Sequence, residues 1–302
     1  MASGSETPVC ARALVNAAGP WVAELLTRLP AGVKRDRVQL VKGSHIVVPR
    51  LYAGDHAYIL QNPDKRVVFL LPFEGLFTLI GTTDIVVAQQ QAPAPTAAEI
   101  AYLCAAASRF MRNPVLPSDV VWRYSGVRAL HDDGHSDPAA VSRDYTLILD
   151  DQNQTPVLSV FGGKLTTHRK LAEVALARLA PWFAAMGAPW TDTRPLPGGD
   201  CADLGALVAD LRRRHPQLPA DWLKQLAHRH GTRAAQIIGP AQQIADLGRD
   251  FGGGLYQCEV LYFIETEWAQ TTEDILWRRS KAGLFMSLAQ QAALALWLKE
   301  RS

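Results

Sequence analysis

The sequence predicts an α+β fold with α/β elements, followed by an all-helical domain. Between residues 35 and 84, closely spaced apolar segments are separated by turn residues, which is typical of an antiparallel sheet. Two other apolar segments each lead through a glycine-containing turn into a helix, as in α/β proteins. Beyond about residue 199 the apolar residues recur only at helical spacing.

Length and composition limit the classes to which the protein can belong. The 302 residues suffice for two domains, and 48% hydrophobic with 20% charged residues is typical of a globular protein. The net charge is +2 and the basic residues are dispersed, so we expect no nucleic-acid partner. None of the four cysteines has zinc-site spacing, which indicates reduced thiols in a cytoplasmic protein and no metal site.

The first elements are expected in the following order. A strand at residues 11–17 leads through Gly19-Pro20 into a helix at 21–26. Sheet strands are expected at 38–40, 45–48, 57–60, 67–71 and 76–80, with breaks at Lys42-Gly43, Asn62-Pro63 and Glu74-Gly75. Thr96 and Glu99 form a capping-box pattern that predicts a helix to about residue 110. Strands at 120–124 and 145–149 flank a polar loop at 131–137, and a strand at 156–161 leads into a helix that ends before Pro181.

A segment rich in proline and glycine at residues 193–199 predicts a domain boundary. The first domain is expected to span residues 1–192 and the helical domain residues 193–302. Helices are expected at 201–213, 221–230, 234–238, 258–266, 274–279 and 287–300. No run of about 18 apolar residues occurs, which leaves only peripheral attachment to a membrane open.

The junction FGGKLTTHRK between the strand at 156–161 and its helix has the features of a cofactor site. Gly162 and Gly163 permit close approach of a ligand, Thr166 and Thr167 add hydroxyl donors, and Lys164 adds a cation. The free N–H groups of a first helical turn favour an electron-rich or anionic group. An ordinary strand-to-helix connection explains the local sequence equally well.

Arginine and histidine side chains suggest an anion-binding site. Arg128 follows a glycine at the end of an apolar strand, where its guanidinium can clamp a phosphate or carboxylate, and Arg143 is a weaker candidate of the same type. A surface arginine or a structural ion pair is the alternative. His45 can accept a hydroxyl proton, although a hydrogen-bonded core histidine is the commoner case. Lys42 is expected to face solvent.

Two further turns carry small or polar residues. Residues 81–84, GTTD, end an apolar strand with two hydroxyls and a carboxylate, and an Asx-type turn is the simplest interpretation. Residues 16–19, NAAG, make a strand-to-helix turn at which a ligand or neighbouring backbone can come close.

Six motifs in series resemble the flavin-dependent glycerol-3-phosphate dehydrogenases of aerobic respiration, the bacterial respiratory form in particular. They are LVNAAGPW (14–21), LVKGSHIVVP (40–49), IGTTD (80–84), WRYSGVRAL (122–130), SRDYT (142–146) and LSVFGGKLTTHRKLA (158–172). Each is weak alone, but their shared order over nearly the whole chain is specific. The resemblance implies the C-terminal part of a D-amino-acid-oxidase-type FAD-dependent oxidoreductase, with an antiparallel substrate-binding sheet and the remaining FAD-domain strands, followed by an all-α domain.

The resemblance also implies an activity. Such enzymes oxidise sn-glycerol 3-phosphate to dihydroxyacetone phosphate by hydride transfer to FAD, and the electrons pass to membrane quinone. They are cytoplasmic proteins attached peripherally to the inner face of the cell membrane, and a homodimer is compatible with this likeness.

Site residues follow from the same resemblance. It implies cofactor-binding roles for Asn16, Ala17, Gly19, Gly162, Gly163, Lys164, Leu165, Thr166 and Thr167. It implies catalytic roles for His45, Arg128 and Lys164, and substrate binding by Arg128, Arg143, Lys164 and Thr83. Because an arginine stays protonated and is therefore a poor base, His45 is the expected proton acceptor and Arg128 the expected anchor or alkoxide stabiliser.

One part of the family pattern has no counterpart in this sequence. The family's N-terminal βαβ unit binds the ADP half of FAD through a glycine-rich turn, and no segment here has the G-x-G-x-x-G spacing. We therefore expect an inactive fragment that binds FAD weakly or not at all, with an unpaired sheet edge open to self-association. Two alternatives remain: another FAD-dependent oxidase of the superfamily, acting on glycerophosphate or an amino acid, and a non-catalytic helical binding module.

Overall fold

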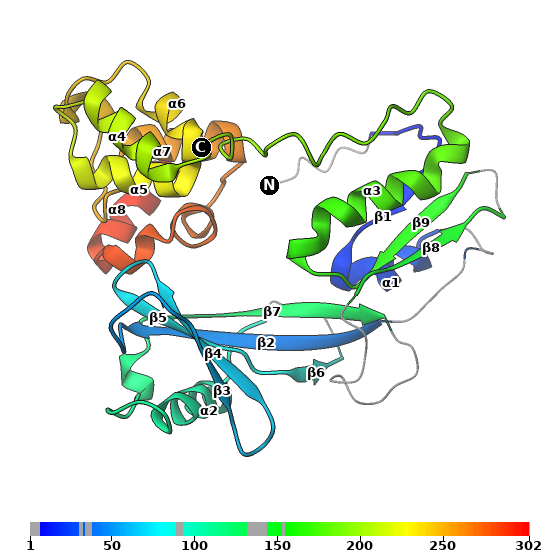
Figure 1. Cartoon of the computed structure of the whole chain (residues 1–302), viewed down its shortest axis with the longest axis horizontal. Coiled ribbons are helices and arrows are strands. Elements are labelled where there is room, and N and C mark those ends of the chain that lie inside the picture. Colours follow the sequence, from blue (N-terminus) through cyan, green and yellow to red (C-terminus); the bar gives the residue numbers. More distant parts are fainter. Residues whose placement is uncertain are drawn as a thin grey trace. The chain divides into compact units, whose positions relative to one another are not determined.

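The structure is a computed structural model that describes residues 7–29, 33, 38–88, 93–131, 144–152 and 155–301. The chain divides into two compact units, Met1–Thr191 and Asp192–Ser302. The first unit contains two β-sheets and the second is built mainly of helices (Figure 1).

The larger sheet of the first unit is organised around one long strand, β2 (Val38–Pro49). One edge of β2 pairs with β7 (Trp122–His131), and the other edge pairs with β6 (Ile85–Val87) and then with β5 (Phe77–Gly81). Beyond β5 the sheet continues with β4 (Val67–Phe73) and β3 (Tyr58–Gln61). All these pairings are antiparallel, as the sequence predicts for the strands within residues 35–84, and β6 and β7 extend the sheet beyond that prediction.

Two expected strand ends are wrong. The Lys42-Gly43 turn signal does not break β2, because Gly43 pairs with Gly126 of β7 and the ladder continues on both sides of it. For the same reason β7 does not end at Tyr124 but runs on to His131, beside β2. The loop expected at residues 131–137 therefore begins one residue later at the earliest, and the rest of it lies outside the described residues.

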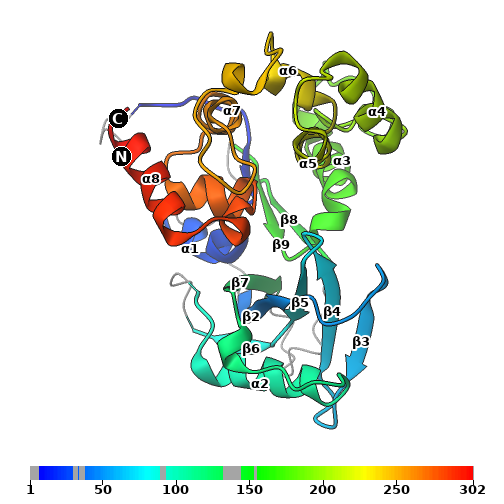
Figure 2. The same ribbon diagram turned by 90° about the vertical axis from the view of Figure 1, so that its left-hand side faces the viewer.

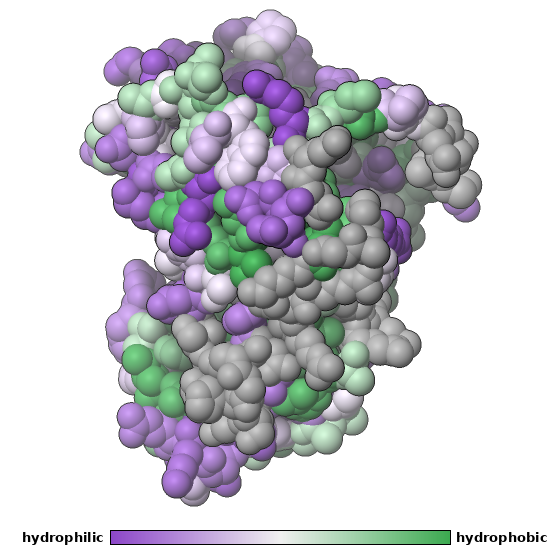
Figure 3. Space-filling model, turned by 90° about the vertical axis from the view of Figure 1, so that its right-hand side faces the viewer, coloured by the Kyte–Doolittle hydropathy of each residue, from purple (hydrophilic) through white to green (hydrophobic). Residues whose placement is uncertain are grey.

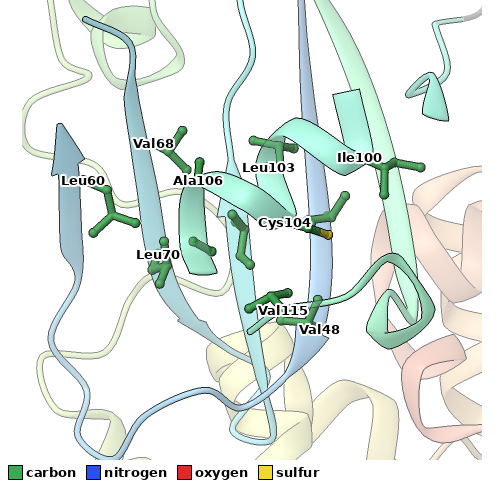
Figure 4. Close-up of a cluster of buried hydrophobic side chains, with 12 residues drawn as sticks. Val48, Leu60, Val68, Leu70, Ile100, Leu103, Cys104, Ala106 and Val115 are labelled. Carbon is green, nitrogen blue, oxygen red and sulfur yellow. The ribbon is translucent and has the colours of Figure 1, made fainter. Parts of the chain in front are cut away.

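Helix α2 (Ala97–Ser108) covers one face of the larger sheet (Figures 1 and 2). The capping box predicted from Thr96 and Glu99 is present at its start. Apolar side chains of β2 to β5 pack against the helix, and Figure 4 shows this core. Its buried members are Ile46, Val48, Leu60, Val68, Leu70, Ile80, Ile100, Leu103, Cys104, Ala106, Ala107 and Val115.

The smaller sheet has three strands. β1 (Leu14–Asn16) lies parallel to β9 (Val157–Phe161), and β8 (Thr146–Asp150) pairs antiparallel with the other edge of β9. Helix α1 (Val22–Thr27) follows β1, and α3 (His168–Leu179) follows β9. Because the carboxyl ends of parallel strands meet at one sheet edge, the turns after β1 and β9 lie at the same edge.

The second unit contains α4 (Leu204–Arg214), α5 (Ala220–His230), α6 (Ala234–Ile238), α7 (Gln257–Glu267) and α8 (Leu288–Lys299). The helix expected at residues 274–279 is a π-helical segment, Asp274–Arg279. Between α5 and α7 the fully buried Glu259 accepts hydrogen bonds from Arg229 (3.1 Å) and pairs with His230 (2.8 Å).

Among the described helices of the chain, none is long and apolar enough to cross a membrane. Where its residues are coloured, the face in Figure 3 mixes hydrophilic and hydrophobic side chains.

A buried carboxylate ties α2 to the larger sheet. Glu99, 4% exposed, accepts hydrogen bonds at Oε1 from the hydroxyls of Ser44 (2.6 Å) and Thr83 (3.0 Å). At Oε2 it accepts from Lys42 Nζ (2.8 Å) and from the backbone N–H (2.8 Å) and hydroxyl (2.9 Å) of Thr96. The expectation that Lys42 faces solvent is wrong, since its side chain is only 12% exposed and pairs with Glu99.

These donors keep Glu99 ionised. Burial raises the pKa of the carboxyl, but the hydrogen bonds from Lys42, Ser44 and Thr96 outweigh it and hold the pKa at about 2, against 4.5 ordinarily. Because the folded-state pKa is depressed, the associated stability is present above pH 4.5 and is lost as the pH falls toward 2. A shift of this size corresponds to roughly 3 kcal/mol at neutral pH.

Replacing Glu99 with Gln should lower the free energy of unfolding of the first unit by about 3 kcal/mol at pH 7, because the Lys42 ammonium loses its buried partner. The variant should also lose the acid-sensitive part of the wild-type stability between pH 4.5 and about 2. Urea denaturation across this pH range measures both effects. Glu24→Gln, which breaks an exposed pair with Arg28, is the control and should cost less than about 1 kcal/mol. Equal losses in the two variants would contradict the assignment.

Candidate functional site

The face of the larger sheet opposite α2 carries His45 and Arg128. Successive side chains of a strand point to opposite faces, and the neighbours Lys42 and Ser44 of β2 point toward α2. The pairing register places Tyr124 and Gly81 on either side of His45. Arg128 lies further along β7 on the same face, where Val41 of β2 pairs with it.

Aromatic rings from neighbouring strands hold the imidazole of His45 in place. Its ring is stacked on that of Tyr124, with centroids 4.9 Å apart and an interplanar angle of 6°. The ring centroids of Trp122 and Tyr124 are 4.9 Å apart, and those of Phe73 and Trp122 are 6.4 Å apart. Burial raises the pKa of Tyr124, so the phenol next to His45 is neutral.

Two glycines make room for these side chains. A Cβ atom at Gly81 would overlap the ring of His45. A Cβ atom at Gly43 would lie 2.6 Å from Thr82 Oγ1 and 2.9 Å from Arg128 Nη2. Any side chain at either position would therefore displace His45 or Arg128.

Arg128 is held by a carboxylate. Its Nη2 donates to Asp84 Oδ1 at 2.7 Å, and both side chains are partly exposed, at 37% and 40%. The expected position of Arg128, at the end of a strand, is wrong because β7 continues past it. The ion pair leaves part of the guanidinium accessible to a ligand on the face of the larger sheet opposite α2, hereafter the open sheet face.

His45 is poised to be neutral at neutral pH. Burial, and then the positive charge of Arg128, lower its pKa from 6.5, and the carboxylate of Asp84 offsets part of this shift. Nδ1 is buried and finds no hydrogen-bond partner among the described residues, so a second ring proton would be poorly stabilised. A neutral imidazole next to a guanidinium can accept a proton from a bound hydroxyl.

The glycine turn after β9 packs against the strand that carries Arg128. Gly162 and Gly163 have φ angles of +71° and +100°, which favour glycine. A Cβ atom at Gly162 would lie 3.0 Å from the backbone oxygen of Asp144 and 3.6 Å from that of Ala129, the residue after Arg128. The turn and the Arg128 segment of β7 are therefore neighbours.

This turn presents unused hydrogen-bond donors. Among the described residues, no acceptor is bonded to the backbone N–H of Gly163, Leu165 or Thr166. The Lys164 ammonium forms no ion pair within that part of the chain, and the Thr167 hydroxyl donates to the Lys164 carbonyl at 2.9 Å. A row of free donors and a cation at the carboxyl end of parallel strands fits a ligand with electron-rich or anionic groups.

In the turn after β1, Asn16 stabilises the local backbone. Its buried Nδ2 donates to the Val22 carbonyl at 2.9 Å, and its Oδ1 accepts from the N–H of Ala18 at 3.4 Å. Ala17 is exposed, and nothing lies within 4 Å of a Cβ atom placed on Gly19. Ala17 and Gly19, rather than the Asn16 side chain, form the open surface of this turn.

The structure brings some expected site residues together and separates others. His45 and Arg128 share one face, and Asp84 of the 81–84 segment binds Arg128 there. Thr83 is 1% exposed and its hydroxyl is engaged with Glu99, on the α2 side of the sheet. Arg143 lies outside the described residues.

Sequence reasoning gave no part in the site to Tyr124 or to the supporting carboxylate Glu99, and it interpreted Asp84 only as part of an Asx-type turn. Their partners lie far away along the chain, so no local pattern pairs them. One signal was available: Lys42 and Ser44 are polar residues two apart in an apolar strand, which places both on one face and implies a buried polar partner there.

Comparison with known protein families gives two matches. Residues 2–169 match a family described as FAD dependent oxidoreductase. Residues 189–297 match the C-terminal domain of alpha-glycerophosphate oxidase.

Individual relatives agree with these families. A glycerol-3-phosphate dehydrogenase of Pseudomonas aeruginosa is 47% identical over 98% of the chain, and a D-erythritol 1-phosphate dehydrogenase of Brucella abortus is 43% identical over 95% of it. The structure of a glycerol-3-phosphate dehydrogenase from Bacillus halodurans, complexed with FAD, superimposes with a TM-score of 0.78 at 25% identity over 96% of the chain. The chain spans 58% of the length of each of the three.

The electrostatics of the site can be tested in the isolated chain. Arg128→Gln should raise the pKa of His45, because it removes a positive charge that disfavours the imidazolium and leaves Asp84 in place. The pH titration of the His45 ring signals by NMR measures this change. Arg123→Gln, on the same strand but the other face, is the control and should leave the titration unchanged. An unchanged or lowered pKa in Arg128→Gln would refute the proximity of the two groups.

Proposed function

The chain belongs to the family of FAD-dependent oxidoreductases, and we propose that the protein oxidises a small polyol phosphate, glycerol 3-phosphate in first place, by hydride transfer to FAD. Two relatives are named as dehydrogenases of such compounds, one of glycerol 3-phosphate and one of D-erythritol 1-phosphate. The observation that carries the proposal is geometric: His45 and Arg128 lie on one face of the larger sheet, and Arg128 Nη2 reaches to 2.9 Å from the Cβ position of Gly43, two residues before His45 on β2. Burial and the charge of Arg128 lower the pKa of His45. This pair combines a proton acceptor with an anion-binding group.

The residues of the smaller sheet fit the cofactor. The N–H groups of Gly163, Leu165 and Thr166, for which the described residues offer no acceptor, would meet acceptor atoms of the flavin, and Ala17 and Gly19 would lie beside the dinucleotide. Backbone atoms of Asp144 and Ala129 lie close to the Cβ position of Gly162, so a ligand would approach this glycine from the opposite side. When bound, FAD supplies the hydride acceptor.

The side chains of the larger sheet then bind the substrate and accept its proton. Loss of hydride from an alcohol carbon is assisted as the hydroxyl proton leaves, and the neutral ring of His45 accepts that proton. Arg128 binds the alkoxide or phosphate oxygen, with its guanidinium directed by Asp84. Lys164 adds positive charge, and Arg143 is proposed as a further phosphate ligand. We assign cofactor and substrate binding to the first unit and an accessory role to the second.

We also propose that the electrons pass to membrane quinone and that the protein works at the inner face of the cell membrane. The six motifs shared with the respiratory enzymes support this. Self-association of this chain as a homodimer is a further proposal, supported by β1, which pairs only with β9 among the described strands and so forms a sheet edge.

An oxidase that uses oxygen is the second candidate, because the second unit matches a domain named for alpha-glycerophosphate oxidase. The two candidates differ in one product. The comparison uses a protein of the full length of the relatives, hereafter the full-length enzyme. If the enzyme is quinone-linked, it should reduce a quinone analogue without forming stoichiometric hydrogen peroxide. Peroxide formed in proportion to glycerol 3-phosphate consumed would favour the oxidase.

In the full-length enzyme, His45→Gln should lower kcat for glycerol 3-phosphate by about 10²–10⁴-fold. The wild-type kcat/KM should fall as the pH drops through the lowered pKa of His45, below 6.5, and should level off above it, because only the neutral ring accepts a proton. Steady-state kinetics against pH measure both effects. If His45→Gln keeps its turnover and its pH profile, His45 is not the base.

The glycine turn is tested by flavin content. Gly162→Ala in the full-length enzyme should lower bound FAD several-fold, because the new methyl group meets Asp144 and displaces the turn. Gly75→Ala is the matched control, since Gly75 also has a positive φ (+73°) but open space around its Cβ position. Gly75→Ala should lose about 1 kcal/mol of stability from its positive φ and Gly162→Ala should lose more because of the added contact, but only Gly162→Ala should lose the flavin absorbance. Equal flavin loss in both would show that the turn acts only through stability.

A further inference from the structure

We propose that Thr83 and Glu99 are positioning residues that fix Asp84, and through it Arg128, beside His45. Neither residue lies on the face that carries His45, and both are at least nine-tenths buried. The catalytic meaning of this inference rests on the proposed function, whereas the arrangement itself can be tested without activity.

Thr83 is fixed by three hydrogen bonds immediately before Asp84. Its hydroxyl donates to Glu99 Oε1 at 3.0 Å and accepts from the backbone N–H of Ser44 at 3.0 Å. Its own backbone N–H donates to the Ser44 carbonyl at 3.4 Å. The next residue is Asp84, whose carboxylate binds Arg128 at 2.7 Å. The position of the Asp84 backbone is therefore set from the α2 side of the sheet.

The same carboxylate also restrains the strand that carries Arg128. An ionised Glu99 only accepts hydrogen bonds, so the hydroxyls of Ser44 and Thr83 must both donate to it. The Ser44 oxygen then accepts the proton of the Ser125 hydroxyl, 2.7 Å away on β7. Glu99 thus determines a single arrangement of donors that connects both the 81–84 turn and β7.

Close packing leaves little room for the turn to shift independently of Arg128. The Thr82 hydroxyl donates to the Thr83 carbonyl at 2.9 Å. The space above Gly43 is filled by Thr82 Oγ1, Arg128 Nη2 and the Thr83 carbonyl, which lie 2.6, 2.9 and 3.2 Å from a Cβ position there. A displacement of Thr83 is therefore transmitted to the guanidinium of Arg128.

The decisive variant is Thr83→Val, which keeps the shape of the side chain and removes its hydroxyl. Thr78→Val is the matched control, because Thr78 is equally buried on β5 and its hydroxyl accepts from the Leu51 N–H at 3.1 Å, away from the site. The readout is the mobility of the Arg128 side chain, measured by NMR relaxation of its Nε–Hε group in this chain. Thr83→Val should mobilise Arg128 as Asp84→Asn does, whereas Thr78→Val and Thr83→Ser should leave it as ordered as in the wild type.

A double-mutant cycle separates positioning from general stability. If Thr83 acts through Asp84, adding Thr83→Val to Asp84→Asn should not mobilise Arg128 further. Should Thr83→Val fail to fold, Glu99→Asp, which shortens the carboxylate side chain, is measured in the same way and should also mobilise Arg128. An Arg128 side chain as ordered in Thr83→Val as in Thr78→Val, or fully additive effects in the cycle, would overturn the inference.

The kinetic consequence is measured separately. In the full-length enzyme, Thr83→Val should raise KM for glycerol 3-phosphate several-fold, with a smaller change in kcat, because the anchor is misplaced rather than removed. Thr78→Val should leave both constants unchanged. If Arg128 becomes mobile in Thr83→Val but the wild-type enzyme does not oxidise glycerol 3-phosphate, the proposed function fails and the positioning role stands. A KM that rises equally in Thr83→Val and Thr78→Val would contradict the positioning role.

Discussion

The buried carboxylate of Glu99 ties helix α2, strand β2 and the 81–84 turn together. A charge removed from water is tolerated only when donors surround it, and Glu99 draws those donors from the start of α2, from β2 and from the 81–84 turn. Because a carboxylate can only accept, its neighbours have a single arrangement of donors. That arrangement sets where β2, the turn and, through Ser44, β7 lie relative to one another.

Because successive side chains of β2 point to opposite faces, the residues that support the site and the residues expected to react lie on different faces of the sheet. Lys42 and Ser44 point to the Glu99 side, and His45 points to the opposite side, toward Tyr124 and Arg128. The supporting network can therefore be charged and fully bonded without altering the open face. On that face, burial and Arg128 keep His45 neutral, while Asp84 prevents the arginine from acting as an unpaired charge. β7 joins the two parts of the site, since it contributes Tyr124 and Arg128 and then passes beside Gly162.

Local patterns predicted those features that have local causes. The capping box at Thr96 and Glu99, the antiparallel sheet and the helical second unit are present because their signals lie within a few residues. The break expected at Lys42-Gly43 is wrong because the ladder with β7, some eighty residues later, overrides the turn signal. Lys42 was misjudged for the same reason, as its partner Glu99 lies 57 residues away. The ion pair between Asp84 and Arg128, and the stacking of His45 on Tyr124, likewise depend on register that no short segment encodes.

We propose that one small phosphorylated alcohol is bound on the open sheet face, between His45, Arg128 and the glycine turn. A crystal structure of the full-length enzyme with glycerol 3-phosphate would show where the substrate lies. We expect a ring nitrogen of His45 within about 3 Å of the substrate hydroxyl and the guanidinium of Arg128 within about 3 Å of a substrate oxygen, with Lys164 on the same ligand. Substrate bound elsewhere, with His45 and Arg128 both out of reach, would contradict it.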